Sequence, residues 1–423
     1  MSASNAGAAN AAADLSTQHS TSALPEGVSR GSPEYRRIAF ALFLAGFSTF
    51  SLLYCVQPLL PEFAAEFQIG PAASSLALSL TTGCLALAIF CAGALSEGAG
   101  RRGLMFISMM LGALLNLVAA FAPSWSMLLV ARALEGLVLG GVPAVAMAYL
   151  AEEIDHRSLG FAMGLYVGGT AFGGMIGRVG MSLLTDLYSW RVAMAAVGII
   201  DLLAALGFLM LLPPSRRFVR RHGKGLGFHL AAWRGHLQHR GLPLLFLTAF
   251  LVMGVFVAIY NYATFRLTAA PYSLSQTQVG LIFSAYLAGM AASPAAGSLA
   301  DRFGRAPVLI AGVVTAAIGV GLTLAAPLAA IISGIILLTI GFFMTHSVAS
   351  AWVGRMGSAA RGHASSLYLL AYYLGSSVLG SVSGWFWEHG GWAAIVNFSL
   401  LLLALTLGVA VYLRHLVRAK TIA

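Results

Sequence analysis

Four charged side chains lie inside stretches of the sequence that are otherwise almost wholly apolar. Arg132 and Glu135 share one such stretch, and Arg178 and Asp201 lie in the next two. At the centre of a membrane-spanning helix a charge costs roughly 2.5–3.5 kcal/mol on insertion scales, so such residues persist mainly where they are paired or functional. Inside a membrane, an acidic side chain can carry a proton and an arginine can bind an anion.

The spacing of these residues suggests one cluster. At 1.5 Å per residue, Arg132 and Arg178 lie roughly 9 Å from the outer membrane edge and Glu135 roughly 13 Å in, one turn from Arg132. We expect an Arg132–Glu135–Arg178 cluster in which Glu135 takes up and releases a proton. Two neighbouring cations favour the charged form of the acid, so protonation would require a conformational change that separates them. A permanent ion cluster tying the two helices together is the alternative.

Two further titratable side chains lie deep in apolar stretches. Asp201 is roughly 16 Å from the outer end of its stretch and is a second proton candidate. The alternatives for it are a protonated side chain within the helix bundle or one facing lipid. His346 is either a packing histidine or part of a proton relay.

Composition explains what positions these side chains. Apolar residues make up 59% of the 423 and charged residues only 9%, against about a quarter charged in soluble domains. About 20 apolar residues suffice to span a bilayer. The sequence therefore predicts an all-α membrane protein with twelve spans, near residues 38–60, 73–95, 103–121, 126–150, 159–184, 190–212, 243–265, 277–299, 307–326, 328–352, 364–386 and 392–413.

The basic residues predict the orientation of these spans. Twenty of the 24 Lys and Arg fall on one side of an even number of spans, which the positive-inside rule places in the cytoplasm. We expect both termini there, in a bacterial inner membrane, with a disordered tail over 1–35 and a short tail over 414–423. The 213–242 loop is basic and contains no acid, so anionic lipid headgroups, rather than nucleic acid, are its expected partner.

A repeat divides the chain into two halves. Gly93-Ala-Leu-Ser-Glu97-Gly-Ala-Gly-Arg101-Arg102 recurs as Gly297-Ser-Leu-Ala-Asp301-Arg302-Phe-Gly304-Arg305, 204 residues later. The sequence thus predicts two six-helix bundles, 36–212 and 243–413. Parallel repeats of this kind place a binding site near the midplane, where the halves meet.

With this motif, GxLaDrxGRr, the chain resembles the major facilitator superfamily over about residues 36–415. The resemblance implies a transporter that alternates access, in which the motif latches the cytoplasmic side of the outward-facing state. Charges that merely enforce topology are the alternative. The residues of this expected latch are Gly93, Glu97, Arg101, Arg102, Gly297, Asp301, Arg302, Gly304 and Arg305.

Two motifs are similar to those of the twelve-span drug:proton antiporter branch. Arg132-Ala-Leu-Glu135-Gly136 follows RxxqG, and the fifth span follows Gx8Gx3GPx2GG with Gly174 in place of Pro and Arg178 in place of the last Gly. Small residues at this spacing let helices approach closely. We expect a helix-packing motif, or else generic glycine packing, at Gly160, Gly169, Gly173, Gly174 and Gly177.

Polar and aromatic side chains at corresponding positions of spans one and seven are the expected substrate cavity: Tyr54, Gln57, Tyr260, Asn261 and Tyr262. An interfacial aromatic belt is the alternative. The two buried arginines favour a neutral or anionic organic solute. We expect no metal, cofactor or catalytic group, and a monomer. Cys55, Cys84 and Cys91 fall in predicted helices, where packing explains them.

The sequence as a whole predicts a secondary transporter, not an enzyme, that exports a small solute in exchange for protons. Proton symport or facilitated uptake is the alternative, and a membrane sensor a remote one. No nucleotide-binding P-loop occurs, which argues against pumping by ATP.

Overall fold

The computed structural model describes residues 27–95, 100–215 and 225–419, and this part of the chain is almost entirely helical. Eleven of its helices are long and apolar enough to cross a membrane. The longest, α17 (Arg361–Arg418), contains two spans, since Gly391 interrupts it with a φ of 59° that only glycine adopts readily. The twelve predicted spans are therefore confirmed.

The first half forms six spans from ten helical segments. They are α2 (Pro33–Tyr54), η1 (Gln57–Leu59), α3 (Leu60–Glu66), α4 (Pro71–Ser74), α5 (Leu76–Leu95), α6 (Arg101–Ala120), α7 (Trp125–Leu139), α8 (Gly141–Glu153), α9 (His156–Leu187) and α10 (Trp190–Leu211).

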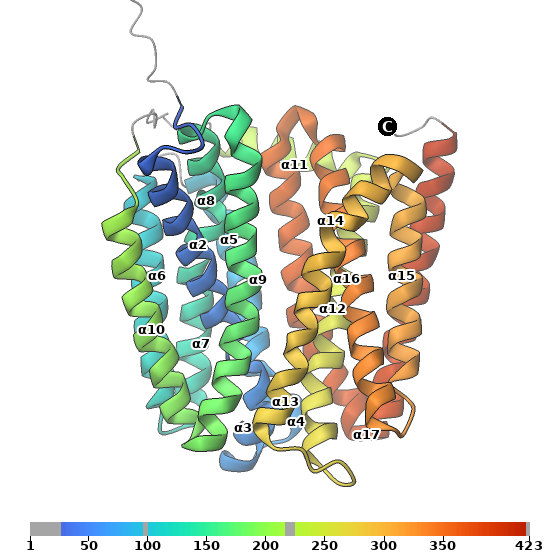
Figure 1. The fold of residues 1–423 in the computed structure, drawn as a ribbon. Helices are drawn as coiled ribbons and strands as arrows, with labels where there is room; N and C mark the ends of the chain where they lie inside the picture. The colour runs from blue at the N-terminus through green and yellow to red at the C-terminus, as the bar shows by residue number, and fades with distance from the viewer. Residues whose placement is uncertain (1–26, 96–99, 216–224, 420–423) are drawn as a thin grey trace, which may run out of the picture.

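The second half repeats this arrangement after a linking helix, α11 (Leu226–Gln238). Its elements are α12 (Leu242–Thr268), α13 (Gln276–Ile282), η2 (Phe283–Ala285), α14 (Tyr286–Phe303), α15 (Arg305–Leu322), α16 (Leu328–Met356), η3 (Ser358–Ala360) and α17. Figure 1 shows α2 to α10 gathered on one side and α12 to α17 on the other, with their helices side by side.

The first span is broken in its middle. Regular α2 ends at Tyr54 and a 3-10 turn containing Pro58 follows before α3 begins. Proline has no N–H to continue the hydrogen-bond ladder, and the change of helix type frees carbonyl groups that an unbroken helix would use. Backbone acceptors are thus available inside the membrane.

Glycines bring α9 against α2. A Cβ atom at Gly169, Gly173 or Gly177 would lie 2.4, 2.2 and 2.9 Å from backbone atoms of Phe43, Phe47 and Ser51 in α2. The other two predicted packing glycines differ. A Cβ at Gly160 would meet nothing within 4 Å, and one at Gly174 would meet the Arg178 side chain. The close approach therefore depends on three of the five positions.

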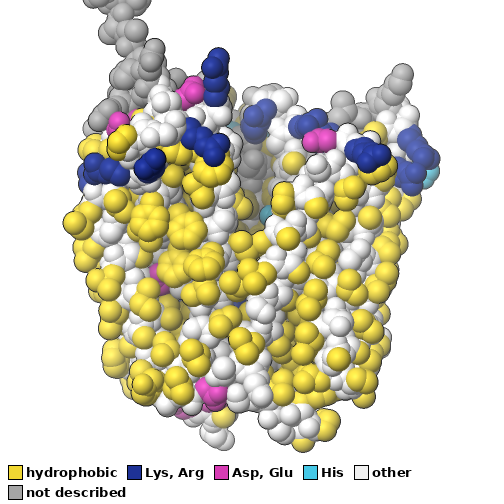
Figure 2. Space-filling view, viewed as in Figure 1, with side chains coloured by type: hydrophobic (Ala, Val, Ile, Leu, Met, Phe, Trp, Pro, Cys, Tyr) yellow, Lys and Arg dark blue, Asp and Glu magenta, His cyan; other side chains and the backbone are white. Residues whose placement is uncertain are grey.

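The two halves touch at one end of the molecule. Basic side chains gather at the other, which we call the basic end, and there the surface is hollowed between the halves (Figure 2). At the opposite end, hydrogen bonds join the halves, from Gln276 to the Pro58 carbonyl at 3.0 Å, from Thr277 N–H to Asp186 at 3.3 Å and from Ala72 N–H to Glu388 at 3.3 Å.

The structure differs from expectation at two connecting segments. The tail expected to be disordered as far as residue 35 is ordered from residue 27, because the Val28 backbone hydrogen-bonds to Glu153 and Asp155 at 2.8 and 3.1 Å. The basic 213–242 loop contains α11, whose Trp233 stacks on Phe90 of α5 at 4.2 Å between ring centroids. The rest of the tail, and residues 216–224 of the loop, lie outside the described residues.

Candidate functional site

Arg132 makes more hydrogen bonds than the other buried charged side chains. It projects from α7 and is completely buried. Its guanidinium donates to the carbonyls of Leu52, Leu53 and Ala77 at 3.1, 2.9 and 3.2 Å, and to Glu135 at 2.6 Å. The first two carbonyls belong to the last turn of α2, directly before the Pro58 break. The break in the first span therefore supplies backbone acceptors that bind this arginine.

A second buried carboxyl group, that of Asp201, lies near the Arg132–Glu135 pair. Glu135 and Asp201 are both fully buried and close enough to interact electrostatically. Oε1 of Glu135 and both carboxyl oxygens of Asp201 have no hydrogen bond of normal geometry, although the Ser48 and Ser51 hydroxyls lie next to Asp201. Asp201 therefore faces the bundle interior, which excludes the lipid-facing alternative.

The charges of this group do not balance. If both carboxyl groups are ionised, this buried group holds two negative charges and one positive charge, and an unpaired buried charge is very costly. A proton on either carboxyl group restores neutrality, because like charges that share a site favour one protonated member. We call Arg132, Glu135 and Asp201 the carboxyl pair site.

Arg178 lies apart from the carboxyl pair site, contrary to the expected three-residue cluster. Its Nε donates to Gln57 at 2.7 Å and its Nη1 to the Gly174 carbonyl of its own helix at 2.6 Å. Its guanidinium carbon lies 4.2 Å from the ring centroid of Tyr54 and 4.9 Å from that of Tyr286. Tyr286 belongs to the second half, so Arg178 faces the junction of the halves instead of Glu135.

Gln57 connects Arg178 to the other half. Its Oε1 accepts from Arg178 while its Nε2 donates to Asn261 of α12 at 2.8 Å. Both amide side chains are buried, and Nδ2 of Asn261 has no partner within the described residues. A buried charge of the first half is thus joined to the second through one side-chain amide.

The other predicted cavity residues point in different directions. Tyr260 hydrogen-bonds to Thr339 at 2.8 Å and stacks on Phe283, whereas Tyr262 stacks on Trp387 of α17. These two tyrosines and Tyr54 are all buried, which excludes an interfacial aromatic belt. Tyr262 packs in the junction of α12 and α17, away from Arg178.

Aromatic residues of spans eight and eleven complete the surroundings of Arg178, and the sequence reasoning missed them. Phe283 begins the 3-10 turn that interrupts the eighth span, and Tyr286 follows the turn directly. Tyr372 of α17 lies near Tyr54 and Tyr286 and contacts Phe342 and His346 of α16. Interrupted helices mark binding sites in transporters, but residues 281–288 contain no Pro or Gly, so this break could not be predicted from the sequence.

His346 borders the same aromatic group. Its Nδ1 lies 3.0 Å from the Tyr368 hydroxyl, and its ring stacks on Phe342 and contacts Tyr372. These contacts satisfy it as a packing residue, and its proton role stays a prediction.

The predicted latch residues of the first half are bonded within that half. Arg101 forms a two-point ion pair with Glu152 at 2.7 and 2.5 Å, and Arg102 donates to the Leu209 carbonyl of α10 at 2.5 Å. Gly93 lies in α5. Glu97 lies outside the described residues.

The second copy of the motif is also bonded within its own half. Asp301 pairs with Arg355 at 3.7 Å, and both side chains are largely exposed. Gly304, at φ 89°, separates α14 from α15, which begins at Arg305, and Arg302 lies over Phe303. A Cβ atom at Gly297 would meet nothing within 4 Å, so this glycine makes no close backbone approach in this conformation. In this conformation the surface is hollowed between the halves at the basic end, so the motif has no surface of the other half to pack against (Figure 2).

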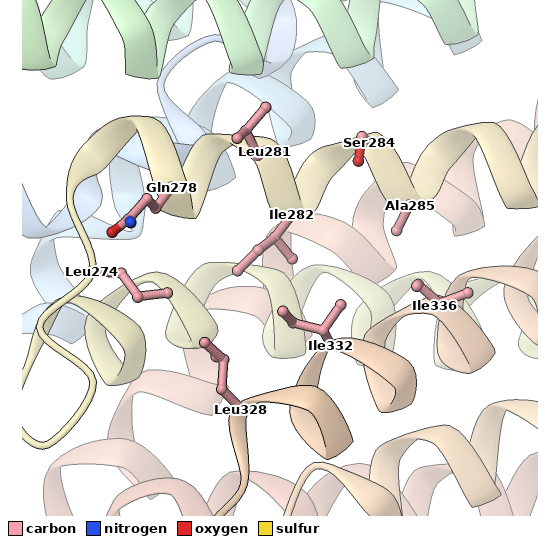
Figure 3. A pocket seen from close by; sticks show the side chains of 9 residues that line it. All are labelled: Leu274, Gln278, Leu281, Ile282, Ser284, Ala285, Leu328, Ile332 and Ile336. Atoms are coloured by element: carbon pink, nitrogen blue, oxygen red, sulfur yellow. The ribbon is translucent and has the colours of Figure 1, made fainter.

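A separate hollow lies between α13 and α16 near the opposite end. Figure 3 shows Leu274, Ile282, Leu328 and Ile332 around it, with Gln278 at its edge. Its volume is about 310 Å³ and no charged residue lines it. Within the described residues no group of three or more His, Cys, Asp or Glu is placed to hold a metal ion.

Two halves of six spans, with buried charges at their junction, define the class as a polytopic transporter. The family model of the Major Facilitator Superfamily matches residues 39–273 and 263–422. The chain belongs to this superfamily.

Similar proteins in bacteria cover nearly the whole chain. The "Uncharacterized MFS-type transporter YybF" of Bacillus subtilis is 44% identical over 393 residues, which is 92% of this chain and 96% of that protein. The "Inner membrane transport protein YnfM" of Escherichia coli is 42% identical, over 93% of this chain and 94% of that protein. A "Probable 4-methylmuconolactone transporter" of Cupriavidus pinatubonensis is 31% identical over 52% of each chain.

Solved structures share the fold at low sequence identity. An inward-facing, occupied bacterial homologue of the human lysosomal transporter Spinster superposes with a TM-score of 0.75 at 13% identity, over 91% of this chain and 98% of that one. The nucleoside transporter NupG gives 0.73, also at 13% identity, over 89% and 99%. The fold is therefore that of these transporters. The family model and the bacterial relatives make the protein a multi-pass secondary transporter and not an enzyme.

Proposed function

We propose that this transporter exports a small neutral or anionic organic solute in exchange for protons. The observation that carries the proposal is the carboxyl pair site, where Glu135 pairs with Arg132, Asp201 lies near Glu135, and one proton balances the charge. Glu135 takes up and releases that proton, and Asp201 is the second acceptor. Without a proton the site holds an excess negative charge, which favours a conformation that admits water.

Arg178 is the proposed link between the solute and the change of conformation. Its aromatic surroundings from both halves suit a flat organic molecule, and its charge suits an anionic group. An anion that binds Arg178 competes with Gln57, and Gln57 in turn holds Asn261 of the other half. Solute binding would therefore loosen the junction that must open at the opposite end.

We further propose that the basic end is cytoplasmic, with both termini there, and that the hollow at that end is the inward-facing state. The excess of Lys and Arg supports this orientation. The two copies of the latch motif, each bonded within its own half, would meet across the halves when this end closes. Anionic lipid at the 213–242 loop and a monomeric state remain part of the proposal.

The direction of transport is tested in inverted membrane vesicles that contain the protein and a pH-sensitive dye. A respiration-driven acid interior is established, and a panel of organic acids and neutral aromatic compounds is added one by one. Antiport predicts release of protons on addition of a transported compound. If transported compounds instead enter without proton release, or carry protons in the same direction, the export proposal is wrong.

A further inference from the structure

Three arginines converge on one pocket at the outer edge of the second half, at the basic end. Arg305 begins α15, and Arg414 and Arg418 lie in the last turns of α17. Together with Phe303 and Trp352 they line a cavity of about 410 Å³. Among the described residues, no acidic side chain lines it.

The charge of this pocket is not balanced by the described residues. Asp301 is the acid that acts on Arg305, and it already pairs with Arg355 at 3.7 Å. The first turn of α15 has no side-chain cap at Gly304, so its free N–H groups add to the positive potential. The pocket therefore favours an anion with several acceptor oxygens.

The corresponding place in the first half is filled. There Arg102 donates to the Leu209 carbonyl at the end of α10, and Arg101 is paired with Glu152. Both arginines at the start of α6 thus have partners within the protein. Arg305 of the second half has no such ion pair within the described residues, and two arginines of the final helix lie beside it.

The position of the pocket identifies the source of the anion. Figure 1 shows the start of α15 and the end of α17 at the outer edge of the second half, away from the first half. Phe303 and Val417, which line the pocket, are 57% and 39% exposed, as apolar side chains are where they face lipid. A transported solute passes between the halves, whereas a lipid headgroup reaches this edge directly from the bilayer.

We propose that this pocket binds the headgroup phosphate of an anionic phospholipid from the leaflet at the basic end. Arg305, Arg414 and Arg418 contact the phosphate, and the apolar edge formed by Phe303 and Val417 takes the start of an acyl chain. Basic pockets between spanning helices are suited to such headgroups. The site is independent of the proposed substrate path.

Native mass spectrometry of the detergent-purified, delipidated full chain tests the site. Dioleoyl phosphatidylglycerol and dioleoyl phosphatidylcholine are titrated separately, and the first bound lipid is quantified. We expect clearly tighter binding of phosphatidylglycerol to the unmodified protein. Arg414→Gln/Arg418→Gln should weaken that binding roughly twentyfold, on the scale of two lost basic contacts at a membrane surface.

The matched control is Arg157→Gln/Arg240→Gln, which removes two basic residues from the same end outside the pocket. It should change phosphatidylglycerol binding less than about twofold, because neither residue contacts the proposed phosphate. Equal losses in both double variants would mean diffuse surface attraction and overturn the site. Equal binding of the two lipids by the unmodified protein would overturn it without any variant. Complete displacement of phosphatidylglycerol by inorganic phosphate would assign the pocket to a soluble anion and reject the lipid.

Discussion

Replacing Glu135 with Gln removes one acid from the carboxyl pair site and keeps the shape of the side chain. Arg132 retains its bonds to the carbonyls of Leu52, Leu53 and Ala77. Asp201 is left as the one acid in a buried group that holds one arginine, so the site is neutral without any proton. The variant should therefore fold and yet have no proton to exchange at this site.

The cost in stability follows from the remaining contacts. Removing one member of a buried ion pair typically costs about 3–5 kcal/mol because a charge is left uncompensated. Here Arg132 keeps its three carbonyl acceptors, the Asp201 carboxylate elsewhere in the same buried group keeps the group neutral, and the amide oxygen introduced by Glu135→Gln can still accept from Arg132. We therefore expect a loss nearer the value of one charged hydrogen bond, about 1–3 kcal/mol.

The effect on transport is much larger than the effect on stability. A pH difference of about two units is worth about 2.7 kcal/mol per proton, which sustains a concentration ratio of roughly 100 for one proton per solute. In proteoliposomes with an imposed pH difference and a solute identified by the vesicle screen, the unmodified protein should approach this ratio. Glu135→Gln should give a ratio near one while still exchanging labelled for unlabelled solute.

Exchange without a gradient separates uncoupling from misfolding, because it requires alternating access but no net proton movement. Glu62→Gln changes a carboxyl group of α3, away from the carboxyl pair site, and should keep full gradient-driven accumulation. If Glu135→Gln accumulates solute as well as the unmodified protein, Glu135 is not the proton carrier and the charge argument fails.

Further variants test the parts around this site. Arg178→Ala should weaken the apparent affinity for an anionic solute at least about tenfold, the scale of one lost charged contact, and Arg178→Lys should weaken it less. Concentration-dependent counterflow measures this affinity. An unchanged affinity would mean that Arg178 is not part of the binding site. A Cβ atom at Gly280 would lie 2.3 Å from the Cβ atom of Ser182. Because these residues belong to different halves, Gly280→Val should push the halves apart and open the end opposite the basic end. Spin labels at Leu187 and Leu324 should then move several ångströms apart, whereas the control Gly321→Val, with nothing within 4 Å, should leave their distance unchanged. Gly173→Ala should lower stability by about 1–3 kcal/mol through overpacking against Phe47, while Gly160→Ala should be neutral or slightly stabilising; thermal unfolding in detergent distinguishes the two, and equal shifts would contradict the packing role of Gly173.

The sequence predicted well what depends on length and on spacing within one helix. The twelve spans follow from apolar length alone. Arg132 and Glu135 pair because residues three apart on a helix are neighbours. Even the break in span one had a signal, since Pro58 and Pro61 follow Gln57 in the middle of an apolar stretch.

Direction around a helix axis could not be predicted in the same way. Arg178 and Glu135 were placed at similar depths, but depth does not say which neighbour a side chain meets. The glycine face of α9 is occupied by α2, and that packing turns Arg178 toward Gln57 and the second half. The surroundings of Asp201 were predicted only from its position in the sixth span. Its neighbours Ser48 and Ser51 belong to α2, and only the packing of α10 on that helix reveals them.

The path between the proton and the halves runs through the broken first span. The carbonyls of Leu52 and Leu53 hold Arg132, and Gln57, three residues beyond Tyr54, joins Arg178 to Asn261. A change in charge at the carboxyl pair site alters how strongly Arg132 binds the carbonyls at the end of α2. That end continues directly into the turn that carries Gln57. Because the helix is interrupted there, it can shift without breaking a regular hydrogen-bond ladder. The break therefore supplies both the acceptors that tolerate a buried arginine and the movable joint through which its charge can act on the other half.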